Sequence, residues 1–270
     1  MSTDLDYLAP VTVDDAVALR AGSPASAYLL GGTDLLPQMR AGRRSPERLV
    51  DLKRIPELHE IRREANGDLS IGAAVPLADL ETNPDVLARF PLLAECAKTV
   101  GAWPLRQRAT LAGNICNASP AADTAVALLA LDAVVNVASA TGPRSIPLER
   151  FFLGPGLTAL VPGDLVTDLV LPAASAGFRG SYLRLSRRKG MDLATVGVLV
   201  GRSSGASPAR WRVGLAAVAP TPLRGREAEV LLEAKGAGAA REAAGLAVAA
   251  CRPITDLRGS AEYRREMVGV

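Results

Sequence analysis

Residues 29–35 read Leu-Leu-Gly-Gly-Thr-Asp-Leu, and this stretch decides how the first part of the chain folds. The apolar run at 27–30 predicts a buried strand, and residues 35–41 have the composition of a helix. The two glycines lack Cβ atoms, so backbone N–H groups there can approach a phosphate closely. A strand, a glycine turn and a helix in this order indicate an α/β unit. The turn alone fits an ordinary turn as well as a phosphate site, and it is not the GxGxxG pattern of a Rossmann domain.

A second polar stretch, residues 110–123, reads Thr-Leu-Ala-Gly-Asn-Ile-Cys-Asn-Ala-Ser-Pro-Ala-Ala-Asp. It lies in a segment, 101–123, whose Gly, Asn, Ser, Ala and Pro content predicts a loop. Loops of this length in compact domains are commonly functional. Its Asn and Ser side chains offer neutral hydrogen bonds to a polar ligand. Asp123 fits two roles, as an acceptor for a ligand hydroxyl or as the N-cap of the next helix.

The remaining pattern divides the chain in two. Apolar runs predict strands at 48–52, 69–73, 132–138 and 165–171, and helices are predicted at 13–21, 76–81, 84–100 and 124–131. Thr12 is a suitable N-cap for the first of these helices. Near residues 172–180 the composition shifts to Pro, Ala, Ser and Gly, which indicates a domain boundary. Strands at 180–185, 195–201 and 211–218, then helices at 227–234 and 239–250, predict an antiparallel sheet backed by helices.

Composition excludes several classes of protein. The chain has 270 residues, of which 49% are hydrophobic and 22% charged, and a net charge of +3. Its basic residues are scattered rather than clustered with aromatics, which argues against a nucleic-acid-binding protein. The N-terminus, Met-Ser-Thr-Asp-Leu-Asp, is acidic where a signal peptide is basic. No apolar run is long enough to span a membrane, so we expect a cytoplasmic protein without a membrane span.

Cysteine and histidine usage narrows the chemistry further. Cys96, Cys116 and Cys251 are odd in number and far apart, so they predict neither disulfides nor a metal or cluster site. His59 is the only histidine, and its surroundings suggest a solvated or structural role. A Ser-His-Asp triad or a multi-histidine metal site has little support. We therefore predict no catalytic side chain and no metal site, so any redox chemistry would depend on a bound cofactor.

The two polar stretches together resemble a known family. Gly31-Gly32-Thr33-Asp34-Leu35, followed by Thr110, Gly113-Asn114, Ala118-Ser119-Pro120 and Asp123, is similar to the FAD-binding loops of the flavoprotein subunits of molybdenum hydroxylases. This is the xanthine dehydrogenase and aerobic carbon monoxide dehydrogenase family. Three later stretches, at 182–192, 217–224 and 256–265, resemble signatures of the same subunits. The resemblance therefore runs along nearly the whole chain, in order.

The resemblance implies an α+β fold with FAD as cofactor. A two-subdomain FAD-binding module of the PCMH or vanillyl-alcohol-oxidase type would occupy residues 1–174, divided at about 1–55 and 56–174. A C-terminal domain of antiparallel sheet plus helices would occupy 175–270. The implied cofactor-binding residues are Leu29, Leu30, Gly31, Gly32, Thr33, Asp34, Leu35, Gly101, Thr110, Ala112, Gly113, Asn114, Asn117, Ser119, Asp123, Leu165, Val166 and Arg184.

Within that set, Leu165 and Val166 match apolar positions near the flavin or adenine, and Arg184 falls near the isoalloxazine ring. Two positions depart from the family pattern. Ala112 replaces a glycine of the second loop, and Arg184 stands where lysine is common, which keeps the charge but changes the hydrogen-bond geometry. The cysteine-rich insert of some relatives is missing, so no cluster is expected in this chain.

The resemblance implies an electron-transfer role. FAD would receive electrons from the 2Fe-2S clusters of an iron–sulfur subunit and deliver them to an external acceptor, while a molybdopterin large subunit oxidises the substrate. The implied assembly is a dimer of heterotrimers. Two other functions stay open: a stand-alone FAD-dependent oxidase or dehydrogenase, and a non-catalytic partner protein with an empty site.

Overall fold

The N-terminal part of the chain forms a small parallel sheet. The computed structural model describes residues 5–203 and 209–270, so the first four residues of the acidic N-terminus lie outside it. The strand order is β1 (Asp6–Leu8), β3 (Arg48–Asp51), β2 (Ser26–Leu29), and helices α1 (Val13–Ala21) and α2 (Leu35–Arg40) connect the strands. Thr12 caps α1 as predicted, with its side chain accepting a hydrogen bond from the Asp15 amide. Strand β1 was not predicted because three residues are too short to show a period.

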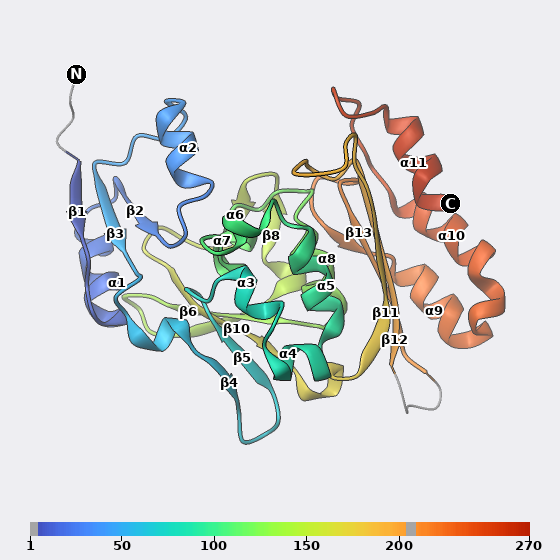
Figure 1. Cartoon of the computed structure of the whole chain (residues 1–270), viewed down its shortest axis with the longest axis horizontal. Coiled ribbons are helices and arrows are strands. Elements are labelled where there is room, and N and C mark those ends of the chain that lie inside the picture. The colour runs from blue at the N-terminus through green and yellow to red at the C-terminus, as the bar shows by residue number, and fades with distance from the viewer. Residues whose placement is uncertain (1–4, 204–208) are drawn as a thin grey trace.

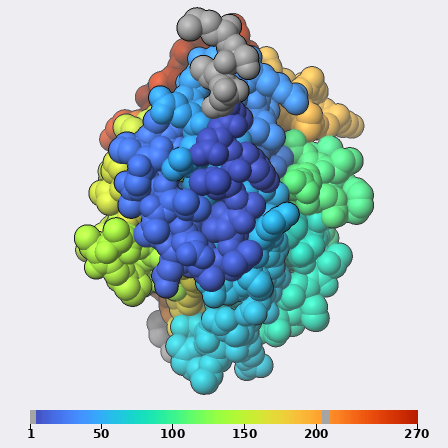
Figure 2. Space-filling view, turned by 90° about the vertical axis from the view of Figure 1, so that its left-hand side faces the viewer, coloured from blue at the N-terminus to red at the C-terminus, as the bar shows by residue number. Residues whose placement is uncertain are grey.

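A five-stranded antiparallel sheet follows. Its order is β4 (Ile61–Arg63), β5 (Leu69–Gly72), β10 (Leu165–Leu171), β6 (Val134–Ala138), β7 (Arg144–Pro147). Between β5 and β6 run helices α3 (Leu77–Leu80), α4 (Pro84–Arg89), α5 (Pro91–Thr99), α6 (Trp103–Arg106), α7 (Leu111–Cys116) and α8 (Asp123–Ala130), which pack beside the sheet (Figure 1). A short hairpin, β8 (Phe152–Gly154) and β9 (Leu157–Thr158), precedes β10. Figure 2 shows the face made by the N-terminal unit (blue), with the β4–β5 hairpin (cyan) below it.

Two predictions for this region were wrong. The single helix expected over 84–100 is interrupted at Phe90, because Pro91 has no N–H to continue the ladder and begins a new helix instead. The segment 101–123, expected as a loop, contains α6 and α7. Helix α7 forms despite its glycine and asparagine because Thr110 caps it, accepting a hydrogen bond from the Gly113 amide at 3.0 Å.

The C-terminal part is an antiparallel sheet with helices on both faces. The strands are β11 (Phe178–Leu185), β12 (Val196–Ser203), β13 (Trp211–Ala216) and β14 (Leu223–Arg224), in that order. Helices α9 (Arg226–Lys235), α10 (Ala240–Ala250) and α11 (Ala261–Gly269) cover the outer face, and α5 and α8 lie against the inner face (Figure 1). The predicted strands and helices of this region are present, and α11 follows them.

Two apolar cores meet at this sheet. Phe178, Tyr182 and Leu199 belong to the core shared with the FAD-module helices, whereas Val213 and Leu215 belong to the core under α9–α11. Strand β13 is therefore buried on both faces, which explains its nearly continuous apolar sequence. The close approach favours a glycine: a Cβ on Gly214 would lie 3.1 Å from the Val126 backbone oxygen of α8, a tight contact.

An ionic network joins the same two parts of the chain. Asp132, which follows α8 in a left-handed conformation (φ +54°), pairs with Arg210, Arg212 and Arg224 at 3.3, 3.0 and 2.6 Å. Arg224 also binds Glu229 through two hydrogen bonds, and both side chains are nearly fully buried. The buried Arg224–Glu229 pair tolerates little displacement, since separating the two leaves a charge without a partner. Through Arg224 this pair is connected to the partly exposed Asp132, which links the C-terminal sheet to the end of α8.

A second buried cluster anchors α11. The Arg264 side chain, 2% exposed, donates hydrogen bonds to the carbonyl oxygens of Thr195 and Ala217 and pairs with Asp256 at 2.6 Å. Asp256 also pairs with Arg258 at 2.7 Å. Burial alone would raise the pKa of Asp256, but the hydrogen bonds from Arg258 and the charge of Arg264 outweigh it and hold that pKa below its ordinary value.

Because the pKa of Asp256 is lowered, its carboxylate is predicted to stabilise the fold at neutral pH and to lose this effect in acid. A carboxyl whose pKa is lower in the folded state stabilises the fold above its unfolded pKa, and this contribution is lost as the pH falls through the folded pKa. We expect Asp256→Asn to destabilise the protein at pH 7, and the difference from wild type to shrink below about pH 4. Urea unfolding at pH 7 and in acid measures this, with the exposed Glu266→Gln as control. A difference that stays constant with pH would contradict the prediction.

Candidate cofactor-binding site

The glycine turn at 29–35, called the first loop here, packs directly against the chain that enters the second loop (110–123). A Cβ placed on Gly31 would lie 1.8 Å from the carbonyl oxygen of Arg108 and 2.6 Å from its carbonyl carbon. No other amino acid fits there without separating the two backbones. Gly32 follows with φ +72°, a conformation that L residues rarely adopt. Glycine is therefore required at 31 by close packing and favoured at 32 by backbone conformation.

The first loop presents backbone donors that the protein itself does not use. Within the described residues, no hydrogen bond is donated by the amides of Gly31, Gly32, Thr33 and Asp34. The Asp34 side chain does not cap α2. Unpaired amides in consecutive residues are typical of an anion-binding nest. The loop can therefore bind a phosphate group through neutral backbone donors.

The first loop is held from behind by a lysine. Lys53 donates a hydrogen bond from Nζ to the Leu30 carbonyl oxygen at 3.3 Å and pairs with Asp51 at 2.7 Å. Asp51 is buried and also accepts a hydrogen bond from the Tyr7 hydroxyl. With the Leu30 carbonyl engaged on this side, the amides that follow are free to face the pocket.

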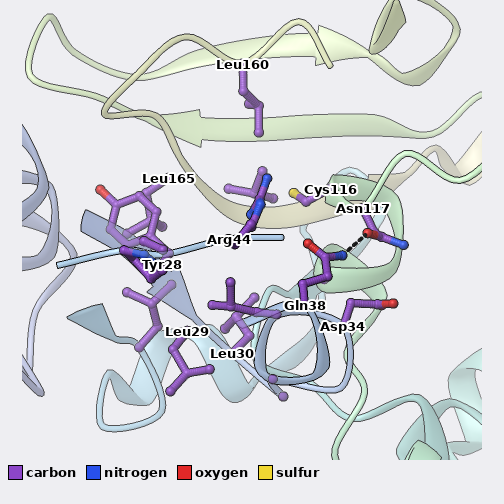
Figure 3. A pocket seen from close by; sticks show the side chains of 18 of the residues that line it. Tyr28, Leu29, Leu30, Asp34, Gln38, Arg44, Cys116, Asn117, Leu160 and Leu165 are labelled. Atoms are coloured by element: carbon purple, nitrogen blue, oxygen red, sulfur yellow. Dashed lines mark hydrogen bonds between the residues drawn. The ribbon is translucent and has the colours of Figure 1, made fainter. Parts of the chain in front are cut away.

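The second loop is ordered by its own side chains. The Asn114 side chain accepts a hydrogen bond from the Thr124 hydroxyl at 2.6 Å, which ties α7 to α8. Asn117 accepts one from the Gln38 side chain at 3.4 Å, so α2 and α7 are linked across the pocket (Figure 3). The two loops, far apart in sequence, therefore meet at one site.

Between them lies a pocket of about 770 Å³. This volume falls in the range of pockets that bind cofactor-sized ligands. Thirteen of the residues named from the sequence line it: Leu29, Leu30, Gly31, Gly32, Thr33, Asp34, Leu35, Thr110, Gly113, Asn114, Asn117, Leu165 and Val166.

The sequence alone missed several residues of the lining. Figure 3 shows four of them, Tyr28, Gln38, Arg44 and Leu160, and Asp164 is a fifth. The Tyr28 hydroxyl donates to the Gly163 carbonyl oxygen at 3.1 Å, and burial raises the pKa of Tyr28 above its ordinary value. Two local signals pointed here: Tyr28 lies in the strand that leads into the first loop, and Asp164 lies in the turn just before Leu165.

Asp123 and Arg184 do not line this pocket; they form a buried pair beside it. Arg184 Nε lies 3.1 Å from the Asp123 carboxylate, which also accepts a hydrogen bond from the Tyr182 hydroxyl at 2.6 Å. Burial raises the pKa of Asp123 above its ordinary value, although Tyr182 and Arg184 oppose this effect. Asp123 is the first residue of α8 and not its N-cap, which is Ala122, so the capping interpretation was wrong.

Gly101, Ala112 and Ser119 also lie outside the pocket lining. Ala112 is fully buried in the core, where its methyl group packs in place of the glycine hydrogen of the family pattern. The Ser119 hydroxyl accepts a hydrogen bond from the Ala121 amide within its own turn. Gly101 has φ +59°, and a Cβ there would lie 2.7 Å from the Leu105 side chain. These three residues shape the loops.

The pocket fits a flavin dinucleotide on the features just described. Unpaired amides at Gly31–Asp34 suit a pyrophosphate, while Leu160, Leu165 and Tyr28 offer an apolar wall for a planar ring. The close contact at Gly31 makes one continuous surface of the two loops. Together these features define the class of protein as one that binds a dinucleotide with a planar ring, which a flavin dinucleotide fits.

Comparison with known proteins identifies the family. Residues 3–174 match the family model described as the FAD binding domain in molybdopterin dehydrogenase, and residues 181–270 match the CO dehydrogenase flavoprotein C-terminal domain. The carbon monoxide dehydrogenase medium chain of Hydrogenophaga pseudoflava is 39% identical over 268 residues, which cover 98% of this chain and 93% of that one. A putative xanthine dehydrogenase FAD-binding subunit of Escherichia coli (strain K12) is 31% identical over 225 residues, covering 83% and 77%.

Comparison with solved structures gives the same family. The carbon monoxide dehydrogenase from Hydrogenophaga pseudoflava superposes with a TM-score of 0.92 at 38% identity, over 98% of this chain and 93% of the other. The chain therefore belongs to the FAD-binding medium subunits of molybdenum hydroxylases, the family of the carbon monoxide and xanthine dehydrogenases. The predicted family, fold class and cofactor, FAD, are confirmed.

Two further findings concern the described residues only. No helix among them is long and apolar enough to cross a membrane. Nor do they contain a group of three or more His, Cys, Asp or Glu side chains able to hold a metal ion. His59 is exposed, with its ring nitrogen 2.9 Å from the Lys53 carbonyl oxygen, and the three cysteines are free.

Proposed function

We propose that this chain relays electrons from the 2Fe-2S clusters of a partner iron–sulfur subunit, through FAD, to an external acceptor. Substrate oxidation would take place on a molybdopterin large subunit, in a dimer of heterotrimers located in the cytoplasm. The chemistry that bound FAD supplies is acceptance of single electrons and release of an electron pair. FAD binding is assigned to residues 1–174, with subdomains of about 1–55 and 56–174, and residues 175–270 form the C-terminal domain.

The proposed site combines the two loops. The amides of Gly31–Asp34 would bind the pyrophosphate, and Thr110, Gly113, Asn114 and Asn117 would bind polar groups along the rest of the cofactor. Leu165 and Val166 would contact a ring. Leu29, Leu30 and Leu35 complete the first loop, while Gly101, Ala112 and Ser119 hold the second in shape. Asp123 and Arg184 form a pair that would lie beside the flavin ring.

The observation that carries the relay function is the chemistry of the pocket lining. As described, the lining contains no histidine, lysine or glutamate. Of its two carboxylates, Asp164 is paired with Arg144, and Asp34 lies in the first loop, where the proposal places the pyrophosphate and not the reacting ring. Burial raises the pKa of the Cys116 thiol to about 12, so that thiol stays protonated at neutral pH. A stand-alone dehydrogenase needs a base to remove a proton from its substrate. Electron transfer between cofactors needs no base, only binding and orientation.

The test is anaerobic reduction of the flavin in the purified chain and in its native complex. We expect the chain alone to bind FAD and to show flavin absorbance. Its flavin should be reduced by the substrate of the complex only when the iron–sulfur and molybdenum subunits are present. Reduction by a small donor without partners would support the stand-alone enzyme instead. A colourless chain that does not bind added FAD would indicate the non-catalytic partner protein.

A further inference from the structure

Arg44 lies at the pocket because the segment after α2 folds back. The amides of Arg43 and Arg44 donate to the Gln38 carbonyl oxygen at 2.9 and 3.4 Å, so the chain turns back over the end of the helix. The Gln38 side chain in turn reaches Asn117 on the second loop. Figure 3 shows the Arg44 side chain in the pocket, between Tyr28 on one side and Gln38 on the other.

Among the charged residues of the lining, Arg44 is the cation whose guanidinium has no partner within the described residues. Arg20 donates hydrogen bonds to the Ser23 and Pro24 carbonyl oxygens and to Ser26 Oγ. Asp164 is paired with Arg144. The Arg44 guanidinium makes no hydrogen bond or ion pair within residues 5–203 and 209–270, and its side chain is exposed.

No carboxylate of the pocket lining neutralises the positive charge of the Arg44 guanidinium. Asp164 is engaged elsewhere, and Figure 3 shows Asp34 on the far side of Gln38 from Arg44. The amides of the first loop are neutral donors, so they solvate an anion without cancelling its charge. A pyrophosphate that binds to them keeps negative charge which a guanidinium is suited to neutralise, through paired hydrogen bonds to phosphate oxygens.

We propose that Arg44 binds the pyrophosphate of FAD from the side opposite the first loop, as the charged half of a two-sided phosphate clamp. This inference rests on the proposed FAD site. It assigns neutral hydrogen bonding to Gly31–Asp34 and charge neutralisation to Arg44. The clamp therefore selects ligands that carry a pyrophosphate, and its strength depends on ionic strength, since salt screens an exposed charge.

The test compares four full-length proteins: wild type, Arg44→Gln, Arg44→Lys and Arg43→Gln. Arg43 is the matched control, because it is the exposed neighbouring arginine and does not line the pocket. FAD is titrated by flavin fluorescence, and ADP, which has the pyrophosphate but no flavin, by calorimetry. We expect Arg44→Gln to weaken both ligands about tenfold. Arg44→Lys should recover part of the loss, and Arg43→Gln should match wild type.

Salt gives a second readout. Raising the ionic strength should weaken FAD binding to wild type more than to Arg44→Gln. Equal FAD affinity in wild type and Arg44→Gln would overturn the clamp, as would a loss for FAD without one for ADP, since Arg44 would then contact the flavin. The clamp would also be overturned if Arg43→Gln weakened FAD and ADP binding as much as Arg44→Gln does. A wild-type chain that binds neither ligand would overturn the FAD site itself, together with the clamp.

Discussion

Gly31→Ala is expected to weaken FAD binding severely and to destabilise the protein. The new methyl carbon would lie 1.8 Å from the Arg108 carbonyl oxygen, far inside contact distance. Because the obstacle is backbone, no side-chain rotation relieves it, and the first loop must move away from the second. We expect FAD affinity to fall by about two orders of magnitude. The free energy of unfolding should fall by about 1–3 kcal/mol, as for other overpacked sites.

Titration with FAD and urea unfolding of the apoprotein measure the two effects separately. Gly238→Ala is the control, because a Cβ there meets nothing within 4 Å and its backbone is not left-handed. That variant should bind FAD as wild type does. If Gly31→Ala bound FAD with wild-type affinity, the two loops would not share one rigid surface, and the proposed site would lose its main support.

Arg264→Met should be the most destabilising change in the C-terminal part of the chain. The substitution leaves the Thr195 and Ala217 carbonyl oxygens without their donor and removes a partner of Asp256. Removing one partner of a buried charged network costs about 3–5 kcal/mol. We expect a loss near the lower end, since Asp256 keeps Arg258. Arg265→Met, on the exposed neighbouring position of α11, should change stability by less than about 0.5 kcal/mol.

The Arg264→Met substitution is also expected to weaken the cofactor site. Ala217, held by Arg264, has φ +63° and donates its amide hydrogen to the Pro120 carbonyl oxygen at 2.7 Å. Pro120 lies in the second loop, so losing Arg264 loosens that loop. FAD should therefore dissociate faster from Arg264→Met than from Arg265→Met, in stopped-flow measurements at a temperature where both variants are folded. Equal rates would show that α11 acts on stability alone.

Local sequence patterns predicted the helices and strands well where their residues interact with near neighbours. Thr12 caps α1 because the bond spans three residues, and the apolar run of β10 indicates a strand from its own seven residues. They failed where two local tendencies compete. Pro91 allowed either a kink or a break, and the small polar residues at 110–116 allowed either a loop or a capped helix.

The sequence by itself determined the glycine turn, the second polar stretch, the order of the elements and the family with its cofactor. These are encoded in short, contiguous segments whose conformation depends on their own residues. Only the tertiary structure placed Gly31 against Arg108 and Arg264 beneath Ala217. It also turned Arg44 into the pocket and paired Asp123 with Arg184. Such contacts join residues far apart in the chain, and their energies depend on burial and distance, which exist only once the chain has folded.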